Sequence, residues 1–261
     1  MFLRKSALEK ELFTVGKKEQ KLKDKKINGT DNAVNLFLNS RIPPNLKNRL
    51  EEAFGYAFGV VFTKGEGIIN KTYSAEKLNS QYKINKYASD IRKDRKSLKQ
   101  FNKTSFTAAN TAFSAVSGTA LGILGIGLPD IVLFVSVLLK NMYEISLNYG
   151  YDCKDENEKK FILMLMRASL SKGDEFLQAD KEADSFINGE ISDTDLESEI
   201  QKTAKVFALE LLCAKFLQGI PFVGVVGGGY NLIYINAVTK YAKMKYYKRF
   251  LTEKQREDNN V

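Results

Sequence analysis

Hydrophobic residues recur at intervals of three and four along almost the whole chain, which is the spacing of one face of an α-helix. The clearest case is the segment 44–63, in which Leu50, Phe54, Phe58 and Val61 would share one face. We find no stretch with the sustained alternation that is typical of a β-strand. The pattern therefore predicts an all-α fold.

Prolines, glycines and capping residues indicate where these helices begin and end. Each of the four prolines falls where a helix should begin, because proline lacks the N–H that the first turn leaves unpaired. Ser74 is expected to cap a long helix over 75–102 with apolar residues on one face and Lys and Arg on the other. Its apolar positions include Leu78, Ile84, Tyr87, Ile91 and Leu98. The other expected helices cover 4–26, 33–38, 44–63, 68–72, 130–148, 155–169, 173–188 and 195–218, and a last helix ends near 251.

Two long uncharged runs, 104–129 and 216–239, lie within this helical pattern. Each contains a break at glycine and proline, in 125–130 and in 219–229. Each run exceeds the roughly 20 residues that span a bilayer. The first run is rich in Ser and Thr and ends at the charged Asp130, and Gly and Asn lower the hydrophobicity of the second. We therefore favour a buried helical core over shallow membrane contact, and either of these over true membrane spans. We expect the two broken apolar hairpins to pack together at the centre of a single multi-helix domain.

The domain organisation follows from charge and length. The chain has 261 residues, of which 44% are hydrophobic and 27% charged, as in an ordinary globular protein. We divide it into a basic N-terminal helix or arm (1–30), an all-helical domain (31–251) and a frayed C-terminal tail (252–261). The N-terminus is charged from its fourth residue, so no secretory signal is expected.

Missing residue types exclude several kinds of site. The chain has no histidine and only two cysteines, which excludes Ser-His-Asp and Cys-His catalysis and tetrahedral zinc sites within the chain. Neither a metal nor a cofactor is expected. Cys213 lies in an apolar run and is predicted to be buried, whereas Cys153 lies in a polar loop and is predicted to be an exposed thiol. Free thiols are typical of a reducing cytoplasm.

The net charge of +9 is unevenly distributed. Residues 1–50 carry a net +7, residues 81–104 a net +6, and residues 240–249 hold five basic and no acidic residues, whereas residues 152–199 carry a net −8. Basic segments suit an anionic membrane surface, a nucleic acid or an acidic partner. The alternative is that the basic and acidic segments neutralise one another inside the fold.

A few polar residues in apolar surroundings are candidates for a binding site. Asp130 either complements the dipole at a helix start or faces a cation or ligand. Asn231 and Asn236 interrupt an apolar helix, where they tie it to a neighbour or line a polar pocket. Gly224 and Gly227 permit close approach of backbone or ligand, but no Lys-Ser/Thr follows them, so a phosphate-binding loop is not indicated.

Several segments resemble the EcsC protein family of bacteria: Leu128-Pro129-Asp130-Ile131, Tyr149-Gly150-Tyr151-Asp152, Ile220-Pro221-Phe222-Val223-Gly224 with Asn231, and Tyr247-Lys248-Arg249-Phe250-Leu251. The stretch 53–103 is similar to the family as well. The resemblance covers the chain from about residue 40 onward and leaves out the arm 1–30. It implies an all-helical bacterial protein associated with membrane processes, without an established activity and without catalytic residues to transfer. Asp130, Tyr149, Asp152, Asn231 and Arg249 match the family's pattern and are candidate site residues.

These observations lead us to expect a non-enzymatic interaction protein at the cytoplasmic membrane face, with an anionic membrane surface or a membrane protein as its partner. One alternative is a binder of a lipid or small apolar molecule, with a pocket at the two breaks lined by Asp130 and Asn231. Another is an enzyme that uses carboxylate, Lys or Tyr chemistry. Nucleic acid ranks last, because no recognised motif accompanies the charge.

Overall fold

The computed structural model describes residues 6–28, 42–64, 74–103, 128–190, 193–217 and 228–259. Within these ranges the chain forms nine α-helices, one 3-10 helix and no strand, which confirms the predicted all-α class. The helices are α1 (Ala7–Asn28), α3 (Pro44–Lys64), α5 (Ala75–Arg92), α6 (Arg95–Lys99), η1 (Gln100–Lys103), α8 (Leu128–Asn148), α9 (Glu156–Leu170), α10 (Gly173–Ile187), α11 (Leu196–Leu217) and α12 (Gly228–Asn259).

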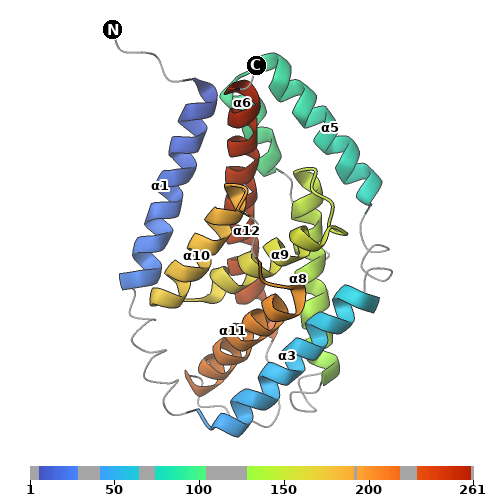
Figure 1. Ribbon diagram of the computed structural model, residues 1–261, viewed down its shortest axis with the longest axis vertical. Helices are drawn as coiled ribbons and strands as arrows, with labels where there is room; N and C mark the ends of the chain where they lie inside the picture. Colours follow the sequence, from blue (N-terminus) through green and yellow to red (C-terminus); the bar gives the residue numbers. More distant parts are fainter. Residues whose placement is uncertain are drawn as a thin grey trace.

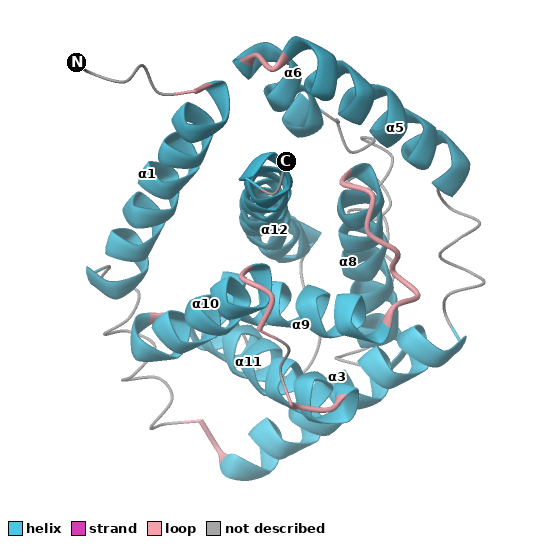
Figure 2. Ribbon diagram, turned by 45° about the horizontal axis from the view of Figure 1, so that its top comes forward, coloured by secondary structure: helices cyan, strands magenta, loops and turns pink. Residues whose placement is uncertain are grey.

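Helix α12 is the axis of the molecule. It has 32 residues and runs along the long direction of the fold (Figure 1). It contacts α1, α8, α9, α10 and η1. In the view of Figure 2, α12 lies in the middle with α1, α8, α9 and α10 around it. Side chains from distant parts of the sequence can therefore meet on α12.

The faces of α3 and α11 pack against each other at one end of the molecule (Figure 1). Phe54 and Phe58 of α3 each lie with their ring centroids 5.6 Å from that of Phe207 on α11. Leu50 and Val61 are buried on the same face of α3. The apolar face predicted for 44–63 is thus confirmed.

Helix α9 crosses the middle of the fold between α10, α11 and α12. Its residues 160–170 are all buried. The start of α9 is set by Asp155, whose side chain accepts hydrogen bonds from the backbone N–H groups of Asn157 (2.7 Å) and Glu158 (3.1 Å). An N-cap of this kind satisfies N–H groups that the first turn leaves without partners.

Prolines, a glycine and an N-cap residue also mark where other helices begin or end. Pro44 is the first residue of α3 and Pro129 the second residue of α8. Helix α8 ends at Asn148, and Gly150 follows with a φ of 85°, a left-handed conformation that glycine adopts at little cost. Ser74 caps α5 as predicted, accepting from the backbone N–H of Lys77 at 3.2 Å.

Two predicted boundaries are wrong. The helix expected over 75–102 breaks, because Lys93 adopts a left-handed φ of 46° and Asp94 caps a new helix through the backbone N–H of Ser97 at 2.7 Å. The expected frayed tail is helical to Asn259. Glu253 accepts a hydrogen bond from the hydroxyl of Tyr151, and Lys254 pairs with Asp90, so this last stretch of α12 is held by side chains of other elements.

The predicted helices over 33–38 and 68–72 lie outside the described residues, as do 125–127 of the first break and 219–227 of the second. The packing of the two broken hairpins against each other therefore stays a prediction.

Candidate functional site

Three of the predicted site residues come together beside α12, and the others do not. Tyr149, Asp152 and Arg249 lie around the turn that joins α8 to α9. Asn236 is exposed on α12 and lines no described pocket. Asp130 and Asn231 lie in the first turns of α8 and α12, but their side chains, like Gly224 and Gly227, lie outside the description.

A pocket of about 440 Å³ opens where the 150–155 turn, the start of α9, the end of α10 and α12 meet. Its size is in the range of small-molecule sites. The lining includes Tyr151, Asp152, Glu158, Glu190, Arg249 and Arg256. Two segments that carry the family resemblance, 149–152 and 247–251, thus contribute to one pocket.

Arg249 is fixed at the pocket wall by charge and by stacking. Its Nη1 lies 2.7 Å from an oxygen of Glu158, its Nε lies 3.1 Å from Glu253, and its guanidinium lies 3.6 Å from the centre of the Tyr151 ring. Burial lowers the pKa of Arg249, but the charge of Glu158 outweighs this and raises the pKa above its usual value. The guanidinium is therefore a permanent cation whose partners come from the protein itself.

Glu158 is the buried centre of this arrangement, and sequence reasoning missed it. It is 4% exposed and also accepts hydrogen bonds from the hydroxyls of Ser146 (2.8 Å) and Tyr246. Tyr149 stacks on Tyr246 with ring centroids 6.0 Å apart, and its hydroxyl donates to Asn102 at 2.9 Å. Tyr149 is thus a packing residue behind the pocket rather than a lining residue.

The pocket favours cations over anions. Its described lining holds five carboxylates and two guanidiniums, and Arg249 is already neutralised by Glu158 and Glu253. Asp152 is exposed at the rim, where its side chain accepts from the backbone N–H of Lys154 at 3.0 Å. An anionic headgroup would meet a net negative lining here, so a contact with anionic lipid has to lie elsewhere.

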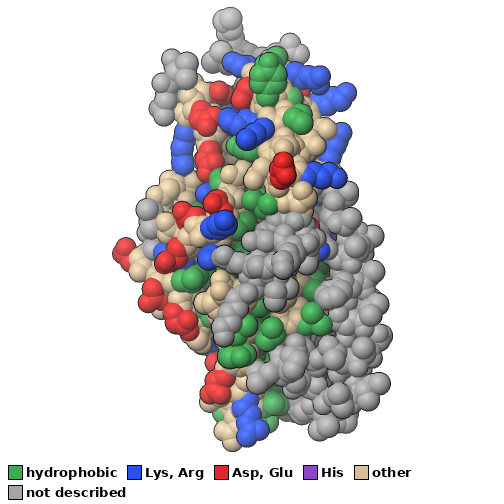
Figure 3. Space-filling view, turned by 90° about the vertical axis from the view of Figure 1, so that its right-hand side faces the viewer, with side chains coloured by type: hydrophobic (Ala, Val, Ile, Leu, Met, Phe, Trp, Pro, Cys, Tyr) green, Lys and Arg blue, Asp and Glu red, His purple; other side chains and the backbone are tan. Residues whose placement is uncertain are grey.

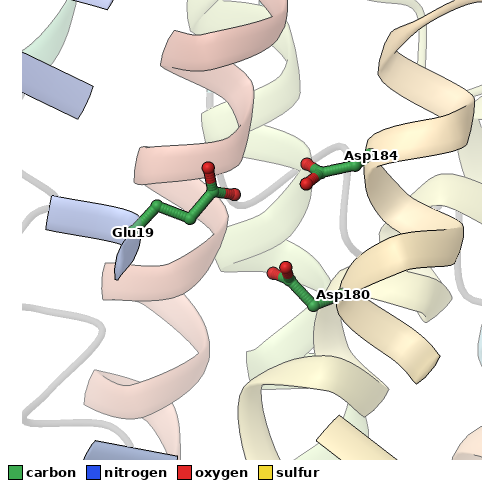
Figure 4. A group of neighbouring side chains, drawn as sticks. All are labelled: Glu19, Asp180 and Asp184. Atoms are coloured by element: carbon green, nitrogen blue, oxygen red, sulfur yellow. The ribbon is translucent and has the colours of Figure 1, made fainter. Parts of the chain in front are cut away.

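A second cluster of carboxylates lies between α1 and α10, about one turn along α12 from Arg249. Glu19, Asp180 and Asp184 point toward one another, with ligand oxygens within 4.8 Å, which is a geometry that could hold a metal ion (Figure 4). The space among them is taken by the ammonium group of Lys245, which lies 2.7 Å from Asp180, 2.6 Å from Asp184 and also bonds Glu19.

Two further lysines complete this cluster. Lys248 lies 2.8 Å from both Glu19 and Asp184, and Lys23 lies 2.7 Å from Asp180. Three ammonium groups thus balance three carboxylates. We interpret the cluster as an ion network that ties α1 and α10 to α12 rather than as a metal site.

Both cysteines are buried, which contradicts the exposed thiol predicted for Cys153. Its thiol donates to the backbone carbonyl of Tyr143 at 3.7 Å, because the polar turn folds back onto α8. The burial predicted for Cys213 is confirmed.

We expect both thiols to react slowly with a disulfide reagent in the native protein. Burial raises the pKa of Cys153 to about 12 and that of Cys213 to about 11, so little of the reactive thiolate forms at neutral pH. Absorbance after addition of Ellman's reagent should rise at least about 100-fold faster in denaturant than in buffer. Fast reaction of one equivalent in buffer would contradict the burial of that thiol.

Some basic residues pair with carboxylates in the fold, and others are exposed without such a pair. In the basic segment 240–249, Lys245, Lys248 and Arg249 are all paired with carboxylates of the acidic segment. Of the seven lysines in 75–103, Lys86 and Lys99 pair with carboxylates. The other five are exposed and have no side-chain ion pair in the part of the chain that is described; these are Lys77, Lys83, Lys93, Lys96 and Lys103. Mutual neutralisation therefore accounts for the C-terminal basic segment but not for the one around α5.

The apolar face predicted for 75–102 is confirmed only at its two ends, where Leu78 packs against the core and Leu98 is buried. Between them, Ile84, Tyr87 and Ile91 are 62%, 69% and 63% exposed, and Asn85 and Ser89 are buried instead. Figure 3 shows this side, with hydrophobic side chains between Lys and Arg in its upper part.

One described stretch, Ile131–Asn148 in α8, has the length and composition of a membrane span, with a mean hydropathy of 1.3. In the fold 72% of this stretch is buried. A helix in the core of a packed domain has the same composition, so this stretch is weak support for a span.

Comparison with known proteins adds the family. The model of the EcsC protein family matches residues 7–251, and thus includes α1, which the sequence resemblance had left out. Neither the curated proteins nor the solved structures gave a match. A match over nearly the whole length shows that the chain belongs to the EcsC protein family.

Proposed function

We propose that this chain is a non-enzymatic interaction protein that acts at the anionic, cytoplasmic face of a membrane. The observation that carries the proposal is the set of unpaired lysines along α5, α6 and η1. In α12, by contrast, Lys245, Lys248 and Arg249 are neutralised inside the fold. Helix α1 also carries exposed lysines, so the test below compares them with those around α5.

The strength of such a contact can be estimated from its charges. Each Lys or Arg near an anionic lipid surface contributes about 1 kcal/mol, so the five lysines are enough for measurable binding. The attraction falls off within a Debye length of about 10 Å at 0.1 M salt, and more salt shortens it further. Binding through these lysines is therefore salt-sensitive.

Vesicle flotation tests the proposal. The protein should float with phosphatidylcholine vesicles that contain about 30% phosphatidylglycerol, and not with phosphatidylcholine alone. Raising the salt from about 0.1 M to about 0.5 M should release it. No binding to anionic vesicles at low salt would contradict the proposal.

Charge reversal locates the contact. The triple variant Lys83→Glu, Lys93→Glu, Lys96→Glu should lower the partition coefficient at least about 100-fold. The matched control reverses Lys17, Lys18 and Lys21, which are equally exposed on α1, away from α5 (Figure 1). An equal loss in both variants would mean that net charge alone drives binding, and would contradict a contact at α5.

A further inference from the structure

Helix α5 buries two polar residues and exposes three large apolar ones. Ile84, Tyr87 and Ile91 follow one another at spacings of three and four and so form one stripe on the outer face. Asn85 is 4% exposed and Ser89 is fully buried on the inner face. A surface helix of a soluble protein normally has the reverse arrangement.

The orientation of α5 is fixed by its contacts with other helices. On the inner side, the ring of Tyr82 packs with its centroid 6.2 Å from that of Phe101. Along its edge, Asp90 pairs with Lys254 of α12. Rolling the helix to bury the stripe would break these contacts, so the outward stripe is a stable feature of the folded chain.

The charges around the stripe decide between its possible occupants. In the sequence, Lys77 and Lys83 come before the stripe, and Lys93 and Lys96 come after it. None of these four lysines has a side-chain ion pair among the described residues. The nearby Asp90 is neutralised by Lys254 and Lys86. A second copy of the chain would bring like charges together, and three side chains cover less than the about 800 Å² per partner of a stable interface. An anionic lipid surface accepts both the lysines and the apolar stripe.

We infer that α5 lies in the plane of an anionic lipid surface, with Ile84, Tyr87 and Ile91 inserted at the boundary of headgroups and acyl chains and the flanking lysines among the headgroups. The inference rests on the proposed function and adds to it the inserting element and the depth of contact. It also distinguishes insertion from a purely electrostatic contact, which would leave the stripe in water.

A single fluorescent reporter tests the insertion, because the chain has no tryptophan of its own. In Tyr87→Trp, anionic vesicles should shift the indole emission to shorter wavelength, and lipids brominated high in the acyl chain should quench it. The control is Tyr56→Trp on α3, a position that is 60% exposed in the free protein. Its emission should stay that of a solvated indole.

Polar substitution of the stripe provides the second measurement. The triple variant Ile84→Ser, Tyr87→Ser, Ile91→Ser should lower the vesicle partition coefficient at least about 10-fold while its residual binding keeps the salt dependence of the lysines. The three positions are exposed, so the helical content by circular dichroism should not change.

The outcomes separate the two proposals. If the wild-type chain does not bind anionic vesicles, both fail. If it binds, but the indole of Tyr87→Trp stays solvated and the triple serine variant binds as the wild type does, the insertion is overturned and the electrostatic contact stands. The insertion would also be overturned by a concentration-dependent dimer that disappears in the serine variant, which would point to a second copy of the chain. It would likewise be overturned if the indole emission changed with a single-stranded oligonucleotide but not with vesicles.

Discussion

Replacing Lys245 by Met should lower the free energy of unfolding by about 3–5 kcal/mol. The ammonium group of Lys245 is fully buried and contacts Glu19, Asp180 and Asp184. Met has nearly the same length but no charge, so three carboxylates, of which Glu19 and Asp180 are buried, would lose a shared counter-ion. Leaving a buried charge without its partner costs far more than an exposed ion pair contributes.

Equilibrium unfolding in urea measures this loss. Lys240→Met is the matched control, since Lys240 lies exposed on the same helix, and it should change the free energy of unfolding by less than about 0.5 kcal/mol. A loss of less than about 1 kcal/mol in Lys245→Met would show that Lys23 and Lys248 compensate.

The difference in the free energy of unfolding between Lys245→Met and the wild type should become smaller as the pH falls from about 7 to about 4. In the wild type, burial raises the pKa of Asp180, but the charge of Lys245 and hydrogen bonds from Lys23 and Tyr241 outweigh it and hold the pKa below its usual value. That carboxylate stabilises the fold above its unfolded pKa of about 3.9, and the contribution is lost as the pH falls further. Without the charge of Lys245, the effect of burial on the pKa of Asp180 is less opposed. Protonation of Asp180 then occurs at higher pH and relieves part of the loss in stability. A difference that does not change with pH would contradict this account.

Local signals in the sequence were enough for much of the fold. The caps at Ser74 and Asp155 and the stop at Gly150 depend on residues within a few positions of each other, and all three are seen. The apolar face of α3 was equally readable, because the spacing of Phe54 and Phe58 alone places them on one side. The break at Lys93 had a signal too, since Asp94 stands three residues before Ser97.

Periodicity shows which residues share a face, but not which way the face points. Ile84, Tyr87 and Ile91 do share a face of α5, yet it is the outer one. What turns it outward is a set of contacts distant in sequence, such as that between Asp90 and Lys254. The same limitation explains Cys153, whose polar neighbours gave no sign that the turn packs against Tyr143.

The candidate site was predictable only in part. Asp152 and Arg249 were found through the family's pattern, and they line one pocket. Their link, Glu158, and the cluster around Lys245 were not found, because a charged residue in a helix looks like an exposed one until its partners are known. Those partners lie far away in the sequence: Arg249 is 91 positions from Glu158, and Lys245 is 226 positions from Glu19.

Gly150→Ala should lower the free energy of unfolding by about 2–4 kcal/mol, because backbone strain and a steric clash add up at this position. Gly150 has a φ of 85°, which L side chains rarely adopt. A Cβ placed there would lie 2.4 Å from two ring atoms of Tyr82, and the ring cannot move freely because it packs against Phe101 on its inner side.

Two further variants separate the two causes, again by urea unfolding. Gly16→Ala on α1 has no atom within 4 Å of the added Cβ and should stabilise the protein by about 0.5–1 kcal/mol, as alanine does within a helix. Combining Gly150→Ala with Tyr82→Ala removes the clash and leaves the strain, so the two changes should together cost less than the sum of their separate effects. Strict additivity would mean that the ring moves aside without cost.

Because Gly150 lines the pocket and Tyr82 holds the inner face of α5, this close approach also links the pocket to the orientation of the stripe. Gly150→Ala should therefore weaken vesicle binding as well, whereas Gly16→Ala should not.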